Sequence, residues 1–418
     1  MLTKITNFTF LLLIFALPFV RGADITYWDR RILVTEIIFP AAVLALILQF
    51  AVKKKLPKFD KFYLPLLFYV VAVTLSTVFS QNPGSSWIKL IGELYLVGIA
   101  VLTYIWISET RDLKKLVLVW TSASFIVALI SAVSLFLFYL DRTNSLLSIT
   151  QARYGTLPVG NYPRIQSLFL NPNMFCHYLT ISWAFLLAAL KFGWIRRWMF
   201  IIAAPVFAIA AAFTISPGIG GILLVIGLWF YFDLAAAGKK KLGQISLAAG
   251  VIGASLFYIS TAVVPTKPIK DKPIGIGNIS VAPSVRFLAW QNSVKTITEY
   301  PIFGKGLETD IAHTAYTLPS GEKIYITDSH QMWLNVFGQA GIFGLFALFF
   351  ISYFLLAGSR PWKFETNQDV IRTFLAVAFT SAFIYQGLFG SYENARHLWV
   401  LIGLLGWSAT NAPEIEQT

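Results

Sequence analysis

The sequence predicts an all-α integral membrane protein with about twelve transmembrane helices. Of its 418 residues, 57% are hydrophobic and only 13% are charged, and the mean hydropathy is +0.68. Apolar runs of roughly twenty residues, the length that crosses a bilayer as a helix, recur along the chain. Lipid offers the backbone no hydrogen bonds, so spanning segments must be helices or closed barrels. The runs are continuous rather than alternating, which favours helices.

Twelve apolar stretches are long enough to be spans. The first resembles a signal peptide because Lys4 precedes it, but no small-x-small cleavage site follows and Arg21 interrupts its flank, so we expect it to be retained. No internal repeat or low-complexity tract is evident, and residues 1–418 are predicted to form a single polytopic membrane domain. The predicted spans are residues 6–21, 32–52, 62–80, 88–107, 115–140, 173–191, 198–214, 219–236, 243–264, 332–357, 370–390 and 397–411.

Lysine and arginine concentrate in alternate short loops between the spans. The positive-inside rule assigns these loops to the cytoplasm and predicts that both termini lie there, although Arg30 and Arg31 oppose the pattern. Two long loops, residues 141–172 and 265–330, are then predicted to face outward. The basic residues of the inward loops are Lys53, Lys54, Lys55, Lys58, Lys61, Arg111, Lys114, Lys115, Arg196, Arg197, Lys239, Lys240, Lys241, Arg360 and Lys363.

The larger outward loop contains a predicted amphipathic helix. Phe287, Trp290, Val294 and Ile297 recur at spacings of three, four and three residues, which places them on one helix face. Ser284 stands where it can cap the start of this helix. We therefore expect a helix that lies along the membrane surface on its apolar face.

Composition and missing motifs exclude several classes of function. The net charge of +13 arises mainly from short loops, where topology and anionic headgroups explain it, so nucleic-acid binding is not expected. The single cysteine, Cys176, lies in an apolar stretch and is interpreted as a core residue. No Walker sequence, complete dinucleotide turn, Asp-x-Asp pair or Gly-x-Ser-x-Gly motif occurs. We expect no cofactor, and the energy for any transfer would come with a lipid-linked donor.

All four histidines, His177, His313, His330 and His397, fall in outward loops or at outward helix ends. No two have the spacing of a metal-ligand pair, so a metal site is not expected. His330 follows Asp328 at the start of a span, where helix amides favour a neutral imidazole and Asp328 can fix its tautomer. Such a histidine can serve as general base for a sugar hydroxyl, and simple capping of the helix is the alternative.

Three arginines, Arg164, Arg286 and Arg396, lie at outward membrane boundaries. A planar guanidinium binds phosphate oxygens bidentately and stays charged at any working pH. Each arginine alone is compatible with a side chain that extends toward lipid headgroups. Together, the three favour a diphosphate ligand.

Several segments carry a family resemblance. They are Arg286-x3-Trp290, Pro301-x2-Gly304-x-Gly306, His330-Gln331-x2-Leu334 followed by Gly338-x2-Gly341-x2-Gly344, Arg164 with Asn171-Pro172-Asn173, and Arg396-His397-Leu398-Trp399. As a set, over residues 150 to 405 or so, they resemble the O-antigen ligase and polymerase superfamily of bacterial envelope glycosyltransferases. The resemblance implies a GT-C-like helical bundle in the bacterial inner membrane with a periplasmic active site.

The resemblance also implies a reaction and a set of residue roles. The reaction is a metal-independent, inverting transfer of a glycan from undecaprenyl diphosphate to an acceptor hydroxyl. Arg286 and Arg164 would bind the diphosphate with Lys305 and Arg396 as further cations, and His330 would deprotonate or orient the acceptor. The supporting residues in this picture are Asp328, Gln331, Asn173 and His397.

The chain departs from the family pattern at two places. Gln331 stands where the family usually has asparagine, which keeps an amide. Ser216-Pro217-Gly218 stands where the family commonly has Ser-Arg-Gly, so a cation is missing that Lys305 or Arg164 would have to replace.

The expected acceptor is a lipid A-core oligosaccharide, which would make the chain an O-antigen ligase. The alternatives are a polymerase that extends one lipid-linked repeat by another and a ligase that glycosylates protein. A secondary transporter is a further alternative from another class, although the two halves show no matching hydropathy repeat and few charges lie within spans.

Overall fold

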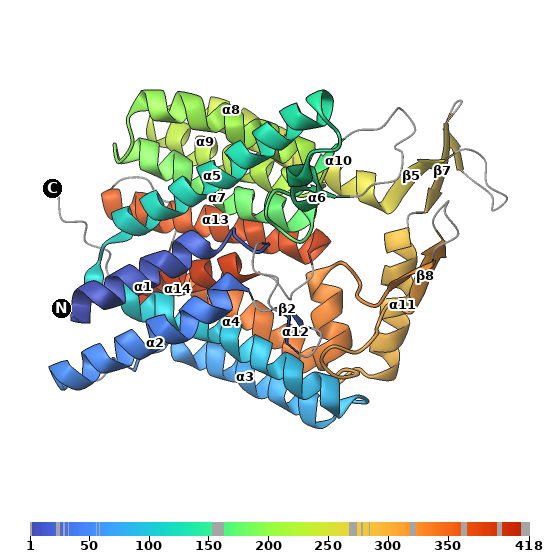
Figure 1. Ribbon diagram of the computed structural model, residues 1–418, viewed down its shortest axis with the longest axis horizontal. Helices are drawn as coiled ribbons and strands as arrows, with labels where there is room; N and C mark the ends of the chain where they lie inside the picture. The colour runs from blue at the N-terminus through green and yellow to red at the C-terminus, as the bar shows by residue number, and fades with distance from the viewer. Residues whose placement is uncertain are drawn as a thin grey trace.

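The computed structural model is an all-α integral membrane protein, and helices account for most of its described residues (Figure 1). The structure describes residues 2–21, 26–27, 30–31, 33–55, 57, 59–152, 163–266, 274–276, 279–283, 285–317, 323–360, 366–390 and 395–410. Ser284, Lys58 and Lys363, which the sequence predictions mention, lie outside the described residues.

Each of the twelve predicted spans corresponds to a helix, with ends that shift by a few residues. Eight described helices, α2, α4, α5, α7, α9, α10, α12 and α13, are long and apolar enough to cross a membrane, and α1, α3 and α8 are shorter apolar helices. The count of twelve spans is therefore not confirmed. The helices are α1 (Leu2–Ala16), α2 (Val34–Lys53), α3 (Tyr63–Val78), α4 (Pro83–Thr110), α5 (Leu113–Leu140), α6 (Ser145–Thr150), α7 (Pro172–Lys191), α8 (Arg197–Phe213), α9 (Ile219–Ala236), α10 (Lys240–Ala262), α11 (Val285–Glu299), α12 (Met332–Ser359), α13 (Asn367–Phe389) and α14 (Arg396–Thr410).

The bundle has a buried centre and an apolar outer surface. α7 and α13 are buried along most of their length, and Trp106, Trp120 and Trp399 are among the largest fully buried side chains. By contrast, large apolar side chains such as Ile91 and Ile201 are exposed on the outer helices. Exposed apolar surface on long helices fits a lipid environment, because water would make it an aggregation liability.

Local signals explain where the long helices begin. Asn82 and Asn171 each accept a hydrogen bond from a backbone amide three residues later, and a proline follows each as the first helical residue. Proline suits this position because its missing N–H would have no partner inside the helix. Thr366 forms a reciprocal capping box with Asp369 at the start of α13.

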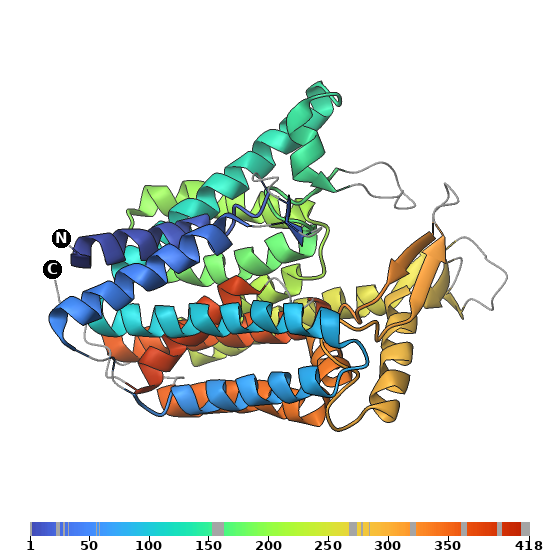
Figure 2. The same cartoon turned by 60° about the horizontal axis from the view of Figure 1, so that its bottom comes forward.

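Short strands and α11 gather at one end of the bundle. The strands are β1 (Thr26–Tyr27), β2 (Arg30–Arg31), β3 (Gln151–Ala152), β4 (Arg164–Ile165), β5 (Val263–Thr266), β6 (Ile274–Ile276), β7 (Ile279–Pro283), β8 (Thr314–Thr317) and β9 (Lys323–Ile326), and all of their pairings are antiparallel. In both views α11 runs across the direction of the long helices beside β5, β7 and β8 (Figures 1 and 2). α1 begins and α2 ends at the opposite end of the bundle (Figure 1).

The helix α11 buries only part of the predicted apolar face. Phe287 and Val294 of the predicted apolar face are 37% and 49% exposed, whereas Ala289, Ser293 and Thr296 are buried. The reason is hydrogen bonding to the neighbouring loop, since the Thr296 hydroxyl donates to the Ile311 carbonyl at 3.0 Å. Tertiary packing has therefore selected a smaller, partly polar face. This face includes Ile297 of the predicted apolar face, which is buried, and leaves Phe287 and Val294 outside the core.

A backbone break in α12 holds the loop that precedes it. Gly341 has φ +64° and ψ −166° inside α12, so the carbonyls of the preceding turn accept hydrogen bonds from outside the helix. The backbone N–H of Lys305 donates to the Gly338 carbonyl at 2.9 Å, and that of Gly306 to the Gln339 carbonyl at 3.0 Å. The break thus fixes the backbone of residues 305–306 against α12.

We expect Gly341→Ala to destabilise the fold by about 2–5 kcal/mol, because the positive φ and the close packing both exclude a side chain. A Cβ atom at position 341 would lie 2.1 Å from the Ile302 carbonyl oxygen. Thermal unfolding in detergent measures the loss. Gly92→Ala in α4 is the control, since a Cβ there meets nothing within 4 Å, and an equal fall in melting temperature for both variants would contradict the argument.

Candidate active site

A cavity of about 510 Å³ brings together side chains from distant parts of the sequence. Its walls come from the segment after α1, from the ends of α7, α11 and α13, from α6, β3 and β4, and from the segment before α12. The lining residues are Arg21, Ser148, Gln151, Arg164, Gln166, Leu170, Asn171, Pro172, Asn173, Met174, His177, Arg286, His330, Gln386, Phe389 and Gly390. Four residues predicted from sequence, Arg164, Asn173, Arg286 and His330, are therefore in one place.

Arg164 is held by the junction between α8 and α9. Its side chain is buried in β4, its Nε donates to the Thr214 carbonyl at 2.7 Å, and its Nη2 donates to Asn173 Oδ1 at 3.0 Å. Ser216 Oγ donates to the same Asn173 oxygen at 2.8 Å. Arg164 thus brings a guanidinium to the Ser216-Pro217-Gly218 segment, where the family pattern commonly has its own arginine.

Arg286 reaches the cavity from the first turn of α11. It lies close enough to His177 of α7 to act on it electrostatically. Because α11 is held on the loop by its buried face, the position of the Arg286 backbone is set by contacts such as that between Thr296 and Ile311. The cavity thus has guanidinium groups from elements on different sides, which suits a ligand with more than one anionic group.

His330 is held by a carboxylate and has a left-handed backbone conformation. Its Nδ1 lies 2.5 Å from Asp328 Oδ1, and its backbone N–H donates to the same oxygen at 2.9 Å. The residue has φ +49°, a left-handed conformation that histidine adopts more readily than most residues. The indole N–H of Trp290 in α11 donates to the neighbouring Ser329 carbonyl at 3.0 Å. With Nδ1 engaged by Asp328, Nε2 is the ring nitrogen suited to accept a proton.

Asp328 stays ionised at neutral pH. Burial raises the pKa of Asp328, but the hydrogen bonds and charge of His330 outweigh burial and hold the pKa below its ordinary value, with a smaller contribution from the charge of Lys89. An ionised Asp328 accepts the Nδ1 proton of His330 and stabilises the imidazolium that forms when Nε2 takes up a proton. This is the arrangement that general-base catalysis by histidine requires.

We expect Asp328→Asn to lower stability at neutral pH by about 1 kcal/mol, since it weakens a charge-assisted hydrogen bond at a partly exposed site. A carboxyl group with a lowered folded-state pKa contributes stability that is present above its unfolded pKa, about 3.9, and is lost as the pH falls through the folded pKa. The melting temperatures of wild type and variant should therefore converge in that acid range. A gap that persists at the lowest pH would contradict this account.

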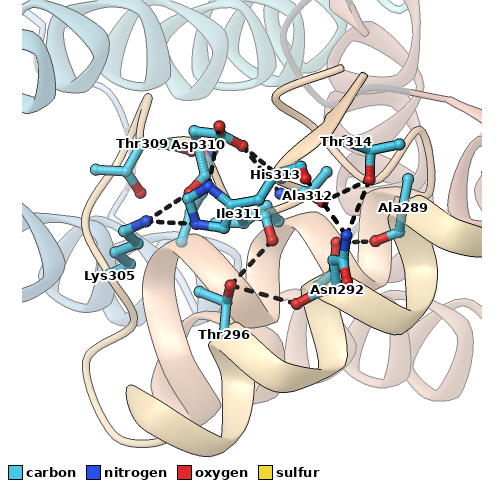
Figure 3. A network of polar contacts seen from close by, with 12 residues as sticks. Ala289, Asn292, Thr296, Lys305, Thr309, Asp310, Ile311, Ala312, His313 and Thr314 are labelled. Carbon is cyan, nitrogen blue, oxygen red and sulfur yellow. Dashed lines mark hydrogen bonds and ion pairs between the residues drawn. The ribbon is translucent and has the colours of Figure 1, made fainter. Parts of the chain in front are cut away.

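Lys305 and Arg396 are not among the residues that line the cavity, and their contacts with the donor phosphate stay predictions. Lys305 Nζ donates to the Asp310 carbonyl at 2.7 Å and lies 2.8 Å from His313 Nε2, within the loop network in Figure 3. Arg396 is buried, and its Nη1 donates to Thr35 Oγ1 of α2 at 3.1 Å. Both cations are thus held by other parts of the fold.

The remaining predicted residues have structural surroundings of their own. His397 is buried with its ring edge-on to Tyr178, at 6.1 Å between centroids. Gln331 precedes α12, and its backbone N–H donates to Ser329 Oγ at 3.2 Å. Neither residue lines the cavity. Among the described residues, no three His, Cys, Asp or Glu side chains come close enough together to hold a metal ion.

Sequence reasoning missed Arg21, His177 and Gln386 as cavity residues. Arg21 follows α1, and its Nη1 donates to the Ile149 carbonyl at 2.8 Å. It meets the same criterion as the other arginines, a guanidinium at an outward helix end, but it was interpreted only as an interruption of a signal-like flank. His177 lies one turn into a span, and nothing local distinguishes it from a core residue. Gln386 lies near the end of α13 and belongs to none of the sequence motifs.

Comparison with known proteins does not assign the chain. No protein-family model matches it, and no curated protein sequence matches it either. The resemblance of its sequence segments to the O-antigen ligase and polymerase superfamily therefore stays a prediction.

Proposed function

We propose that the protein is a glycosyltransferase of the O-antigen ligase type, which transfers a glycan from undecaprenyl diphosphate to a hydroxyl of lipid A-core oligosaccharide. The observation that carries the proposal is the convergence of Arg164, Arg286 and His330 on one cavity. These residues come from β4, α11 and the segment before α12. A pair of guanidiniums beside an oriented imidazole matches what transfer from a diphosphate to a hydroxyl requires.

The step is a single displacement at the anomeric carbon of the donor sugar. The acceptor oxygen forms a bond to this carbon as His330 Nε2 takes the hydroxyl proton, and the bond from this carbon to the diphosphate oxygen breaks. The electron pair leaves with the diphosphate, where Arg164 and Arg286 neutralise the developing charge. Attack opposite to the leaving group inverts the anomeric configuration.

The chain's own residues can supply this chemistry by positioning and charge stabilisation. Diphosphate is already a good leaving group, so orientation of donor and acceptor makes a large contribution to the rate. Asp328 is 2.5 Å from His330 Nδ1 and stabilises the imidazolium that the step creates. In this proposal the site faces the periplasm of the bacterial inner membrane, both termini are cytoplasmic and no metal takes part.

The deciding experiment is transfer by purified full-length protein in detergent with EDTA. The protein receives an undecaprenyl-diphosphate glycan and either lipid A-core or a second lipid-linked repeat. Product on lipid A-core supports the ligase, and chain extension would instead make the protein a polymerase. No product with either acceptor would overturn both assignments, and transfer to protein or substrate counterflow in proteoliposomes would then identify a protein ligase or a carrier.

A further inference from the structure

The side chain of His177 is buried without a hydrogen-bond partner at the wall of the cavity. It is 1% exposed, it lines the cavity, and neither Nδ1 nor Nε2 has a hydrogen-bond partner among the described residues. An unsatisfied buried polar group is destabilising, and nearly all such groups in folded proteins have a hydrogen-bond partner. A ligand in the cavity would supply the missing partner.

His330 and His313 differ from His177 in this respect. His330 Nδ1 is 2.5 Å from an Asp328 oxygen, and His313 Nδ1 is 3.1 Å from an Asp310 oxygen. Each of those rings has a carboxylate that fixes its orientation. The charged or polar neighbours that act electrostatically with His177 are Arg286 and His397. Neither forms a hydrogen bond with the His177 ring in this structure.

The surroundings of His177 indicate which part of a ligand it meets. Arg286 lies beside it, and in the proposed function Arg286 binds the donor diphosphate. The donor diphosphate is bonded to the polyprenyl chain on one side and to the first sugar of the glycan on the other, and of these two only the sugar has hydrogen-bonding groups. An imidazole ring offers a hydrogen-bond donor and an acceptor when neutral, as a sugar hydroxyl or acetamido group does, whereas guanidinium groups only donate. Gln386, which also lines the cavity and is buried in α13, adds an amide of the same character.

We propose that His177 binds the first sugar of the lipid-linked donor by hydrogen bonding to one of its hydroxyl or acetamido groups. This inference rests on the proposed function, because it takes the diphosphate at Arg286 as its reference point. It assigns His177 a role in recognising the sugar, separate from charge neutralisation by Arg164 and Arg286 and from proton transfer by His330.

The test compares binding of three soluble donor analogues to the full-length protein in detergent by calorimetry. The probes are farnesyl diphosphate, farnesyl-diphosphate-linked N-acetylglucosamine and farnesyl-diphosphate-linked galactose. Wild type should bind at least one sugar-linked probe more tightly than farnesyl diphosphate. His177→Phe fills the ring volume without hydrogen bonds and should remove most of that gain, on the order of tenfold, while binding of farnesyl diphosphate stays unchanged.

His177→Gln is the second variant, because its amide keeps a donor and an acceptor, and it should restore part of the gain. Melting curves establish that both variants fold. A loss in His177→Phe that is equal for all three probes, or the absence of any gain from sugar in wild type, would overturn the role of His177 and leave the diphosphate site intact. Failure of wild type to bind even farnesyl diphosphate would overturn the proposed function itself.

Discussion

His330→Ala is expected to reduce the rate of glycan transfer by about 10²- to 10⁴-fold, the usual contribution of a positioned general base. The side chain lies at the cavity with its Nδ1 held by Asp328 at 2.5 Å, so its removal deletes the proton acceptor and leaves the guanidinium groups in place. Donor affinity should therefore change little. Single-turnover transfer and calorimetric binding of farnesyl diphosphate measure the two quantities separately.

The chain contains a matched control for this variant. His313 also pairs with a carboxylate shortly before it in the chain, with Nδ1 3.1 Å from Asp310 Oδ2, and it also has a positive φ, +41°. It contacts Lys305 in the loop network of Figure 3 and does not line the cavity. His313→Ala should keep near-normal transfer. Comparable rates for the two variants would show that His330 does no more than cap α12.

Much of the fold could be predicted because a lipid bilayer allows an apolar spanning segment few backbone structures. A continuous apolar run of twenty residues has one stable form in a bilayer. The predicted span starts at residues 88, 173 and 370 lie within five residues of the helix starts at Pro83, Pro172 and Asn367. A helix at α11 was predicted, but the side chains that it buries were predicted only in part. The buried face depends on hydrogen bonds between Thr296 and Ile311, which no periodicity in the helix itself reveals.

Only part of the candidate site could be predicted from the sequence. Residue type and an outward helix end were enough to select Arg164, Arg286 and His330, which do line the cavity. The same criterion also selected Arg396, whose side chain is turned toward Thr35 of α2. Whether a guanidinium at a helix end faces a cavity or a neighbouring helix is decided by packing between distant segments, and one sequence does not contain that information.

Arg286→Ala is expected to weaken binding of farnesyl diphosphate by about 10- to 100-fold, because charge-assisted hydrogen bonds to phosphate contribute about 1.5–3 kcal/mol. Arg286→Lys should recover only part of the affinity, since an ammonium group keeps the charge but loses the planar, bidentate geometry. Calorimetric binding in detergent measures both variants. Arg142→Ala is the control, because Arg142 lies in the other long loop, stacks over the ring of Phe138 and does not line the cavity.

The contrast between Arg286 and His330 tests the division of labour in the proposed site. Removal of a cation that holds the ground-state donor changes affinity and rate together, whereas removal of a general base changes the rate alone. If Arg286→Ala and His330→Ala lose the same donor affinity, the two side chains act as one binding unit and the assignment of separate roles is wrong. If Arg286→Ala binds donor normally but transfers slowly, Arg286 acts only on the charge that develops in the transition state, and Arg164, held by Thr214 and Asn173, is the residue that retains the donor.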